Sequence, residues 1–316
     1  MSILISGTIA YDYIMDFPDT FRNHILPDKI HMLNVCFVVD QLKKEYGGTA
    51  GNIAYTMKLL GGDPIIFSPV GSDGRDYLEY LKKLGIRTSY MPVIEDRLTA
   101  SAHITTDKDD NQITAFYNGA HDRATNLHVG DVAEMIDFAI VGPTDKRAMI
   151  QHAKECYDHH IPFVCDPGQQ MTTLGKQELM AMIGQAKMYM VNDYEMQLTK
   201  DKTGWGAEEL LEHVGVVVQT FGPKGSLIMT KEKRIEIQPC PPKSVDDPTG
   251  AGDAYRAGFF TAHVNGHDLK TCGQMGSVAA AYAIEHYGTQ NHAFTATEFQ
   301  ERYKSIYGET ISLLGQ

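Results

Sequence analysis

Short apolar runs separated by longer mixed stretches constrain the fold of this 316-residue chain more than any other feature. From residue 130 onward, four such runs occur: Phe138–Gly142, Ile161–Cys165, Met188–Val191 and Val214–Val218. Unbroken apolar runs of this length are typical of parallel strands that are covered on both faces. Segments compatible with helices, including Asp145–His159 and Lys176–Gly184, lie between the runs. This β-α-β alternation predicts a doubly wound α/β core.

Both ends of the chain extend this core. Ser2–Ser6 and Ile65–Val70 predict two further strands, and apolar faces predict three helices near the C-terminus. Those helices cover Thr249–Val264, Leu269–Tyr287 and Ala296–Tyr307. No repeat and no Pro/Gly/Ser-rich linker divides the chain, so we expect a single domain over residues 1–316.

Two regions of the N-terminal half depart from this alternation. Residues 12–46 and 99–118, approximately, are rich in the aromatic and β-branched side chains that favour strands. Asp109-Asp110-Asn111 is a turn pattern between two such runs. We therefore expect a small antiparallel sheet that is built from insertions and projects from the core.

The charge balance and the termini exclude several classes of protein. The chain has 28 Lys and Arg against 40 Asp and Glu, a formal net charge of −12, and such acidity disfavours nucleic-acid binding. Five Cys without a C-x-x-C pair indicate reduced thiols, neither a zinc site nor a disulfide framework. The N-terminus lacks the cationic start of a signal peptide, and no uncharged apolar run approaches the roughly 18 residues of a spanning helix. We expect a cytoplasmic protein with no membrane partner.

The strongest motif is Asp247-Pro-Thr-Gly-Ala-Gly-Asp253, which precedes a predicted helix. Gly250 and Gly252 allow the backbone to turn so that its amides converge, and a helix N-terminus favours anions. A carboxylate at Asp253, beside a bound phosphoryl group, is placed to accept a proton from an attacking hydroxyl. Taken alone, the motif also fits a Gly-rich turn with Asp253 as an ordinary N-cap.

A second glycine-rich element is Gly47-Gly-Thr-Ala-Gly-Asn52. Its glycines allow the backbone to approach a ligand closely, and Asn52 supplies both a donor and an acceptor. A turn followed by a helix cap explains the same residues, so this run by itself is weak evidence of a site.

In this order and spacing, the two elements resemble the two signatures of the ribokinase-like (PfkB) family of sugar and nucleoside kinases. The resemblance extends from residue 1 to about residue 290. It implies a three-layer α/β/α core with a small β-sheet lid over the phosphate acceptor, which agrees with the sheet expected from residues 12–46 and 99–118. It also implies that Asp253 is the general base and that the amides of Gly250, Ala251 and Gly252 form an anion hole.

Two further segments match the family's nucleotide site. Asn192-Asp-Tyr-Glu195 resembles its Asn-x-x-Glu motif, which implies that Glu195 holds the hydrated Mg²⁺ of ATP; a strand-to-helix cap is the alternative explanation. Thr220-Phe-Gly-Pro-Lys-Gly225 resembles the family's nucleotide loop and implies that Thr220, Gly222 and Gly225, with Asn192, bind ATP without a Walker-type loop. Whether a monovalent cation is a further cofactor stays open.

The acceptor side of the resemblance involves the first strand and the lid. Asp12 is similar to the family's carboxylate for vicinal sugar hydroxyls, with Gly48 and Asn52 completing the polar contacts and Thr8 at the same pocket. The lid segments resemble those of microbial adenosine kinases, which implies further substrate contacts at Cys36, Phe116 and Gln170.

The lid also bears on which acceptor is bound. An aromatic ring such as Phe116 offers a stacking platform for a purine, although packing within the lid explains it nearly as well. Where related enzymes carry a second aromatic, this chain has Ala102 beside His103, so either residue of the pair Phe116 and His103 could stack on the base.

The leading hypothesis is ATP-dependent 5′-phosphorylation of adenosine to AMP, a purine-salvage reaction. A ribokinase, or another sugar or nucleoside kinase of the same family, is the alternative enzyme. A non-catalytic nucleoside sensor is the alternative from another class, and the intact Asp253, Glu195 and glycine loop argue against it. Exposed strand edges in residues 99–118 also suggest a homodimer formed through the lid.

Overall fold

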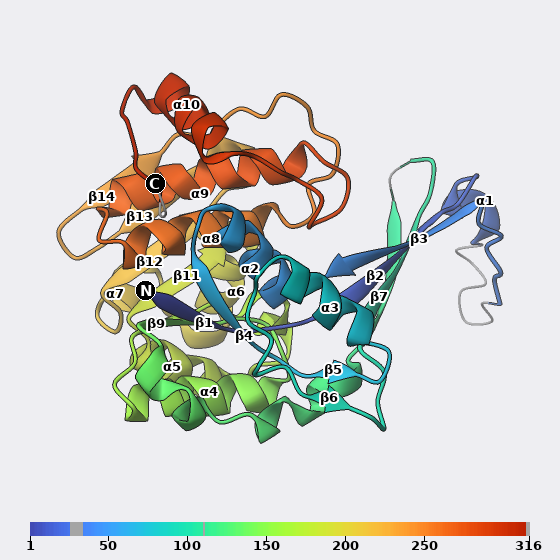
Figure 1. The fold of residues 1–316 in the computed structure, drawn as a ribbon, viewed down its shortest axis with the longest axis horizontal. Coiled ribbons are helices and arrows are strands. Elements are labelled where there is room, and N and C mark those ends of the chain that lie inside the picture. Colours follow the sequence, from blue (N-terminus) through green and yellow to red (C-terminus); the bar gives the residue numbers. More distant parts are fainter. Residues whose placement is uncertain (26–33, 110, 314–316) are drawn as a thin grey trace.

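A mixed eight-stranded sheet forms the centre of the computed structural model, which describes residues 1–25, 34–109 and 111–313 (Figure 1). The strand order is β14-β13-β12-β11-β10-β9-β1-β4, and neighbouring strands are parallel from β12 to β4. The parallel strands are β1 (Ser2–Ser6), β4 (Asp63–Phe67), β9 (Phe138–Val141), β10 (Phe163–Cys165), β11 (Met188–Asn192) and β12 (Val216–Thr220). The antiparallel strands β13 (Ser226–Met229) and β14 (Arg234–Ile237) complete one edge.

Helices cover both faces of this sheet, as the apolar runs predict. Along β1, Ile3 and Ile5 belong to one hydrophobic cluster and Leu4 to the other, because successive side chains of a strand point to opposite faces. The first cluster is completed by α2 (Thr49–Leu59), α3 (Arg75–Lys83), α8 (Ala251–Val264), α9 (Leu269–Ile284) and α10 (Ala296–Tyr307). The second is completed chiefly by α4 (Lys146–Asp158), α5 (Lys176–Gln185), α6 (Asp193–Thr203) and α7 (Ala207–Leu211).

A four-stranded sheet projects from the core on the side of α3 (Figure 1). Its order is β3-β2-β7-β8, with β2 (Ala10–Asp16), β3 (Gln41–Gly47), β7 (Ala100–Thr106) and β8 (Gln112–Tyr117). The expectation of a purely antiparallel sheet is wrong, because β2 and β7 pair in parallel. Sequence runs predict strands but do not fix the direction in which distant strands pair.

The hairpin expected in residues 99–118 is confirmed, since β7 and β8 are antiparallel neighbours. Residue 110 of its expected turn lies outside the described residues, as do residues 26–33 of the first insertion. The short helix α1 (Phe21–His24) and the two-stranded ribbon of β5 (Val70–Gly71) and β6 (Val93–Ile94) complete the N-terminal half, together with short 3₁₀ turns such as η2 (Gly119–Asn126).

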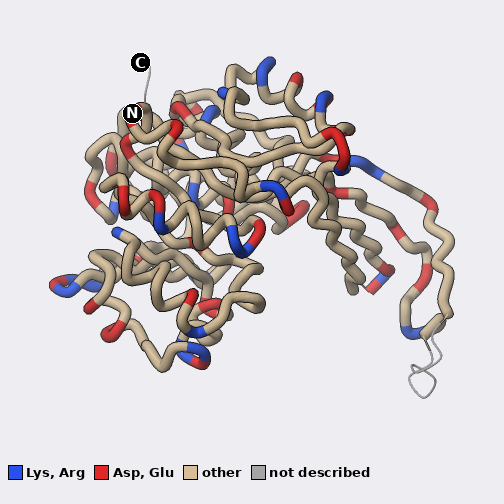
Figure 2. Tube along the Cα trace, turned by 90° about the horizontal axis from the view of Figure 1, so that it is seen from below, with Lys and Arg blue, Asp and Glu red and all other residues tan. Residues whose placement is uncertain are grey.

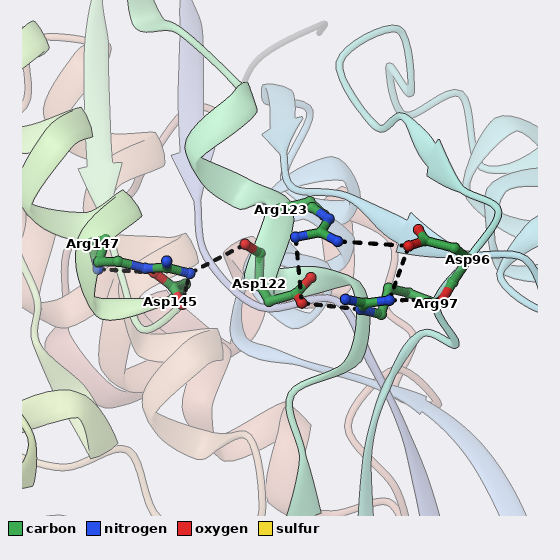
Figure 3. A network of polar contacts seen from close by, with 6 residues as sticks. All are labelled: Asp96, Arg97, Asp122, Arg123, Asp145 and Arg147. Carbon is green, nitrogen blue, oxygen red and sulfur yellow. Dashed lines mark hydrogen bonds and ion pairs between the residues drawn. The ribbon is translucent and has the colours of Figure 1, made fainter.

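A network of ion pairs and hydrogen bonds joins the base of the projecting sheet to the core (Figure 3). Arg97, which precedes β7, contacts Asp122 in η2 through Nε at 3.0 Å. Arg147, at the start of α4, donates to the main-chain carbonyl of Asp122 at 3.3 Å and also binds Asp145. The segments that enter β7 and leave β8 are therefore fastened to each other and to α4.

Basic and acidic positions are interspersed along the described chain (Figure 2). Many of them form exposed ion pairs, such as Arg87 with Asp63 and Lys270 with Glu309. None of the described helices combines the length and the apolar character that a crossing of the bilayer requires.

Candidate active site

The carboxyl ends of the parallel strands meet at one edge of the main sheet, where two pockets lie. The larger pocket, of about 770 Å³, lies between this edge and the projecting sheet and is lined by Thr8, Asp12, Gly48, Phe116 and Gln170, among others. The smaller pocket, of about 400 Å³, is lined by residues at the ends of β10, β11 and β12, including Asp166, Asn192, Glu195, Thr220 and Gly222. Asp253 and Gly252 line both, so the N-terminus of α8 stands where the pockets meet.

The turn before α8 exposes backbone amides toward this junction. Gly250 has φ +79°, a left-handed conformation that glycine adopts without strain. Within the described residues, the amides of Gly250, Gly252 and Asp253 have no hydrogen-bond acceptor, whereas the amide of Ala251 reaches the carbonyl of Pro248 at 3.3 Å. Three unpaired donors at a helix N-terminus favour an anion. The sequence predicts an anion hole of the Gly250, Ala251 and Gly252 amides. The Ala251 amide is partly engaged by Pro248, and the Asp253 amide is an additional free donor.

Asp253 is half-buried and held by one defined contact. Nδ2 of Asn52 donates to its Oδ2 at 2.8 Å. Burial raises the pKa of Asp253 to about 6, against the opposing effects of the Arg256 cation and of the Asn52 hydrogen bond. A carboxyl group with this pKa is ionised at neutral pH and is still basic enough to accept a proton.

Asp12, on β2, faces the larger pocket without a hydrogen bond to any described residue. Burial, reinforced by the charges of Asp253, Asp247 and Glu45, raises its pKa to about 7. Gly48 has φ +87°, and a Cβ there would lie 2.5 Å from the carbonyl oxygen of Thr8, so only glycine lets the chain pass this close. The Thr8 hydroxyl itself donates to the carbonyl of Pro143.

The projecting sheet presents one face to the larger pocket. Asp12, Ala102 and Phe116 are register partners across β2, β7 and β8, and all three line the pocket. Phe116 is 54% exposed, so its ring is not buried in the packing of the sheet. His103 lies on the opposite face, where it stacks on Tyr13 at 4.9 Å. Of the two rings considered for base stacking, the structure brings only Phe116 to the pocket.

Three of the residues predicted from sequence, Cys36, Ala251 and Gly225, line neither pocket. Cys36 is exposed on the segment before β3 and lines neither pocket, whereas the other four cysteines are buried and free. Gly225 is also absent from both linings. A Cβ at Gly225 would lie 2.1 Å from the carbonyl oxygen of Ile237, so close packing against β14 explains this glycine.

Asn192 and Glu195 lie at the start of α6 and line the smaller pocket. They form a capping box, in which the amide of Glu195 donates to Oδ1 of Asn192 and the amide of Asn192 donates to Oε2 of Glu195, each at 2.8 Å. The two explanations of this motif are therefore compatible, since Oε1 of Glu195 makes no hydrogen bond with a described residue. Burial raises the pKa of Glu195, while the nearby Arg256 lowers it.

Sequence reasoning missed four polar residues of the site. Arg256 and Asp166 form a buried ion pair on the wall of the smaller pocket. His121 and Thr144 are buried side chains that line the larger pocket. Nε2 of His121 accepts from the amide of Ile9 at 3.1 Å, so its proton is on Nδ1, and Nδ1 and the Thr144 hydroxyl have no partner among the described residues.

A doubly wound sheet with its site at the carboxyl ends of the strands, covered by a second sheet, is the ribokinase-like fold shared with solved kinases. The chain belongs to the PfkB family of carbohydrate kinases, because the sequence model of that family matches residues 20–296.

Several relatives share most of the chain. A nucleoside kinase of Methanocaldococcus jannaschii is 34% identical over 298 residues, which are 94% of each chain. The structure of Burkholderia thailandensis nucleoside kinase in complex with inosine is 39% identical, covers 98% of this chain and 99% of that one, and has a TM-score of 0.90. The ribokinase of Thermotoga maritima, 20% identical, shares the fold with a TM-score of 0.80 over 96% of this chain and 99% of that one.

Proposed function

We propose that the protein is a nucleoside kinase that transfers the γ-phosphoryl group of ATP to the 5′-hydroxyl of adenosine, forming AMP for purine salvage in the cytoplasm. The observation that carries this proposal is the position of Asp253 and the free amides of α8 at the meeting point of the two pockets. The larger pocket would hold the nucleoside and the smaller pocket the triphosphate of ATP.

In this arrangement, the reaction is a direct displacement at phosphorus. The 5′-oxygen forms a bond to the γ-phosphorus, the bond to the bridging oxygen of ADP breaks, and Asp253 takes the hydroxyl proton on its unpaired Oδ1. The free amides of Gly250, Gly252 and Asp253 would stabilise the charge on the transferring group. The four-stranded sheet would act as a lid that limits the access of water, the competing acceptor.

The smaller pocket fits Mg²⁺ only when ATP supplies most of its ligands. No group of three or more His, Cys, Asp or Glu that could hold a metal occurs in the described part of the chain. One carboxylate with a free oxygen, Glu195, suits a cation that keeps several waters and binds chiefly to phosphate oxygens. Mg²⁺ bound there would neutralise charge on the β- and γ-phosphates.

The larger pocket favours a nucleoside over a free sugar. Asp12 has unpaired oxygens that would accept from vicinal ribose hydroxyls, and the exposed ring of Phe116 offers a surface for a base. The nucleoside kinases among the relatives support the same class of acceptor. Inosine is the second candidate acceptor, because a neighbour 39% identical to this chain has a structure in complex with it.

Analysis of the products tests this proposal and separates an enzyme from a sensor. With Mg-ATP and adenosine, we expect one AMP for each ADP formed, with the phosphate on the 5′-oxygen by ³¹P NMR. With inosine, the product would be the corresponding 5′-monophosphate. Adenosine binding with no ADP formed would instead identify a sensor, and ADP formed without a phosphorylated nucleoside would leave water as the acceptor.

A further inference from the structure

Arg256 lies one turn after Asp253 on α8, and its guanidinium is fixed by a buried carboxylate. Its Nε and Nη2 donate to the two carboxylate oxygens of Asp166, the second at 2.7 Å. The side chains of Arg256 and Asp166 are 11% and 1% exposed. This bidentate ion pair holds the planar guanidinium in one orientation.

The remaining nitrogen of Arg256, Nη1, points to the anion-binding turn. A Cβ added to Gly252 would lie 2.8 Å from Nη1, so this nitrogen packs directly against one of the turn residues with a free amide. Nη1 makes no hydrogen bond to any residue that the structure describes. Arg256 also lines the smaller pocket, so an unused charged donor stands beside the free amides.

Charge makes this donor significant. Among the described residues that line either pocket, Arg256 is the only Lys or Arg, whereas Asp12, Asp166, Asp193, Glu195 and Asp253 are acidic. The guanidinium is close enough to Asp253 and Glu195 that its charge opposes the rise in pKa that burial causes in both carboxyl groups. A triphosphate in this surrounding needs positive charge, and among the described lining residues Arg256 is the one side-chain cation that can supply it.

We propose that Arg256 is a further catalytic residue, whose Nη1 contacts the γ-phosphoryl group of ATP, and that Asp166 is its positioning residue. This proposal rests on the proposed phosphotransfer. It adds a side-chain cation to the amides of the anion-binding turn, and a side chain at position 252 would press on that cation, because its Cβ would lie 2.8 Å from Nη1.

The test compares Arg256→Ala and Arg256→Lys with Arg302→Ala. Arg302 is a matched control because it also pairs with a buried carboxylate, Glu285, at side-chain exposures of 9% and 7%, and it lines neither pocket of the site. Melting temperatures would identify variants that remain folded. The measured quantities are kcat, the KM for the nucleoside, and the affinities for ADP and for a non-hydrolysable ATP analogue with Mg²⁺.

We expect Arg256→Ala to lower kcat by about 10²–10³, the loss typical of one transition-state donor, with the nucleoside KM within about threefold of wild type. The ATP analogue should bind about tenfold more weakly, the loss of one charge-assisted hydrogen bond, and ADP within about twofold. Arg256→Lys should recover only part of kcat, because an ammonium group cannot hold Asp166 by two bonds and also reach the turn. Guanidinium ion added to Arg256→Ala should restore part of kcat.

Arg302→Ala should lower the melting temperature without changing kcat beyond about twofold and without response to guanidinium. A folded Arg256→Ala or Arg256→Lys protein with wild-type kcat and wild-type affinity for the ATP analogue would overturn the proposal. Equal losses of kcat in Arg256→Ala and Arg302→Ala would reduce Arg256 to a structural residue. If wild type itself phosphorylates no acceptor, the proposed function fails, while the comparison of ATP-analogue and ADP binding still tests the phosphate contact.

Discussion

Asn52 and Asp253 lie 201 positions apart in the chain, yet Nδ2 of Asn52 donates to Oδ2 of Asp253 at 2.8 Å. Oδ1 of Asn52 in turn accepts from Nε2 of Gln290 at 3.0 Å, which fixes the orientation of the amide. The pair joins the first turns of α2 and α8, where the two glycine-rich elements of the sequence meet. The sequence predicts that Asn52 binds substrate. In the structure, its amide also donates to the carboxylate that is proposed as the general base.

Replacement of that base is the first prediction. Asp253→Asn should lower kcat by at least about 10²-fold, since the amide cannot accept the hydroxyl proton. The two side chains are similar in size, so nucleoside affinity measured by calorimetry should change little. Retained turnover in folded Asp253→Asn would remove the residue from this role.

The pH dependence of turnover follows from the same carboxyl group. Burial raises the pKa of Asp253 to about 6, so kcat/KM should decline as the pH falls through 6 and the base becomes protonated. Asn52→Ala removes a hydrogen bond to the ionised form and should move this decline to higher pH by about one unit. The charge of Asp253 also acts on Asp12, while the charges of Arg256, on α8, and Asp166, at the end of β10, act on Asp253. The pH profiles of wild type and Asn52→Ala are therefore compared with these three residues unchanged. A decline that stays at the same pH in Asn52→Ala would contradict this assignment.

Phe116 should distinguish nucleosides from free sugars. Phe116→Ala should raise the KM for adenosine by roughly tenfold, within the usual loss of 1–3 kcal/mol for a stacked base, and should leave any turnover of ribose unchanged. Tyr117→Ala is the control, because Tyr117 is also exposed but follows Phe116 on the strand and points to the other face. Equal effects of the two substitutions would indicate loss of sheet packing.

His121 should contribute to nucleoside binding through Nδ1. Burial lowers the pKa of His121 to about 4, so the ring is neutral at pH 7 and donates from Nδ1 only. His121→Phe removes this donor and should raise the nucleoside KM by up to about tenfold, the value of one hydrogen bond, without changing the KM for ATP. His121→Gln, which keeps a donor, should recover part of the loss. Parallel increases in both KM values would point to a structural effect.

The projecting sheet predicts self-association. β8 is an edge strand whose residues are all exposed, including Ile113 and Tyr117. Such an edge is a template for pairing with another chain. We expect sedimentation at micromolar concentration to show a dimer, and Ile113→Lys to shift it toward the monomer without lowering the melting temperature. A wild-type monomer under these conditions would contradict dimer formation through β8.

The parallel core was predictable because its strands are continuous apolar runs. The strand Ser2–Ser6 and the helix Ala296–Tyr307 begin and end where the sequence predicts, and the other core strands differ by a few residues at most at either end. β13 and β14 were missed, since each has only four residues and β14 alternates charged and apolar side chains. The parallel pairing of β2 with β7 joins residues about 90 positions apart, and local sequence does not encode it.

The site was predictable where a motif is local and not where it is assembled by the fold. The turn at Gly250 and Gly252 lines the larger pocket, and Asn192 and Glu195 line the adjoining smaller pocket. The sequence predicts that Gly225 binds ATP. In the structure, its backbone packs so closely against the carbonyl of Ile237 that a Cβ would not fit. Arg256 lies three residues after the strongest motif. The sequence assigns it no role, because its ion-pair partner, Asp166, is distant in the chain.

ADP release with Mg-ATP and adenosine, inosine, guanosine, ribose or fructose at equal concentration tests the proposed nucleoside kinase activity most directly. The proposed pocket predicts turnover dominated by a purine nucleoside, with adenosine first, and little turnover of the free sugars. Turnover dominated by ribose or fructose would keep the phosphotransfer at Asp253 but contradict the nucleoside assignment. No turnover of any acceptor by folded protein would contradict the claim that this site is a kinase.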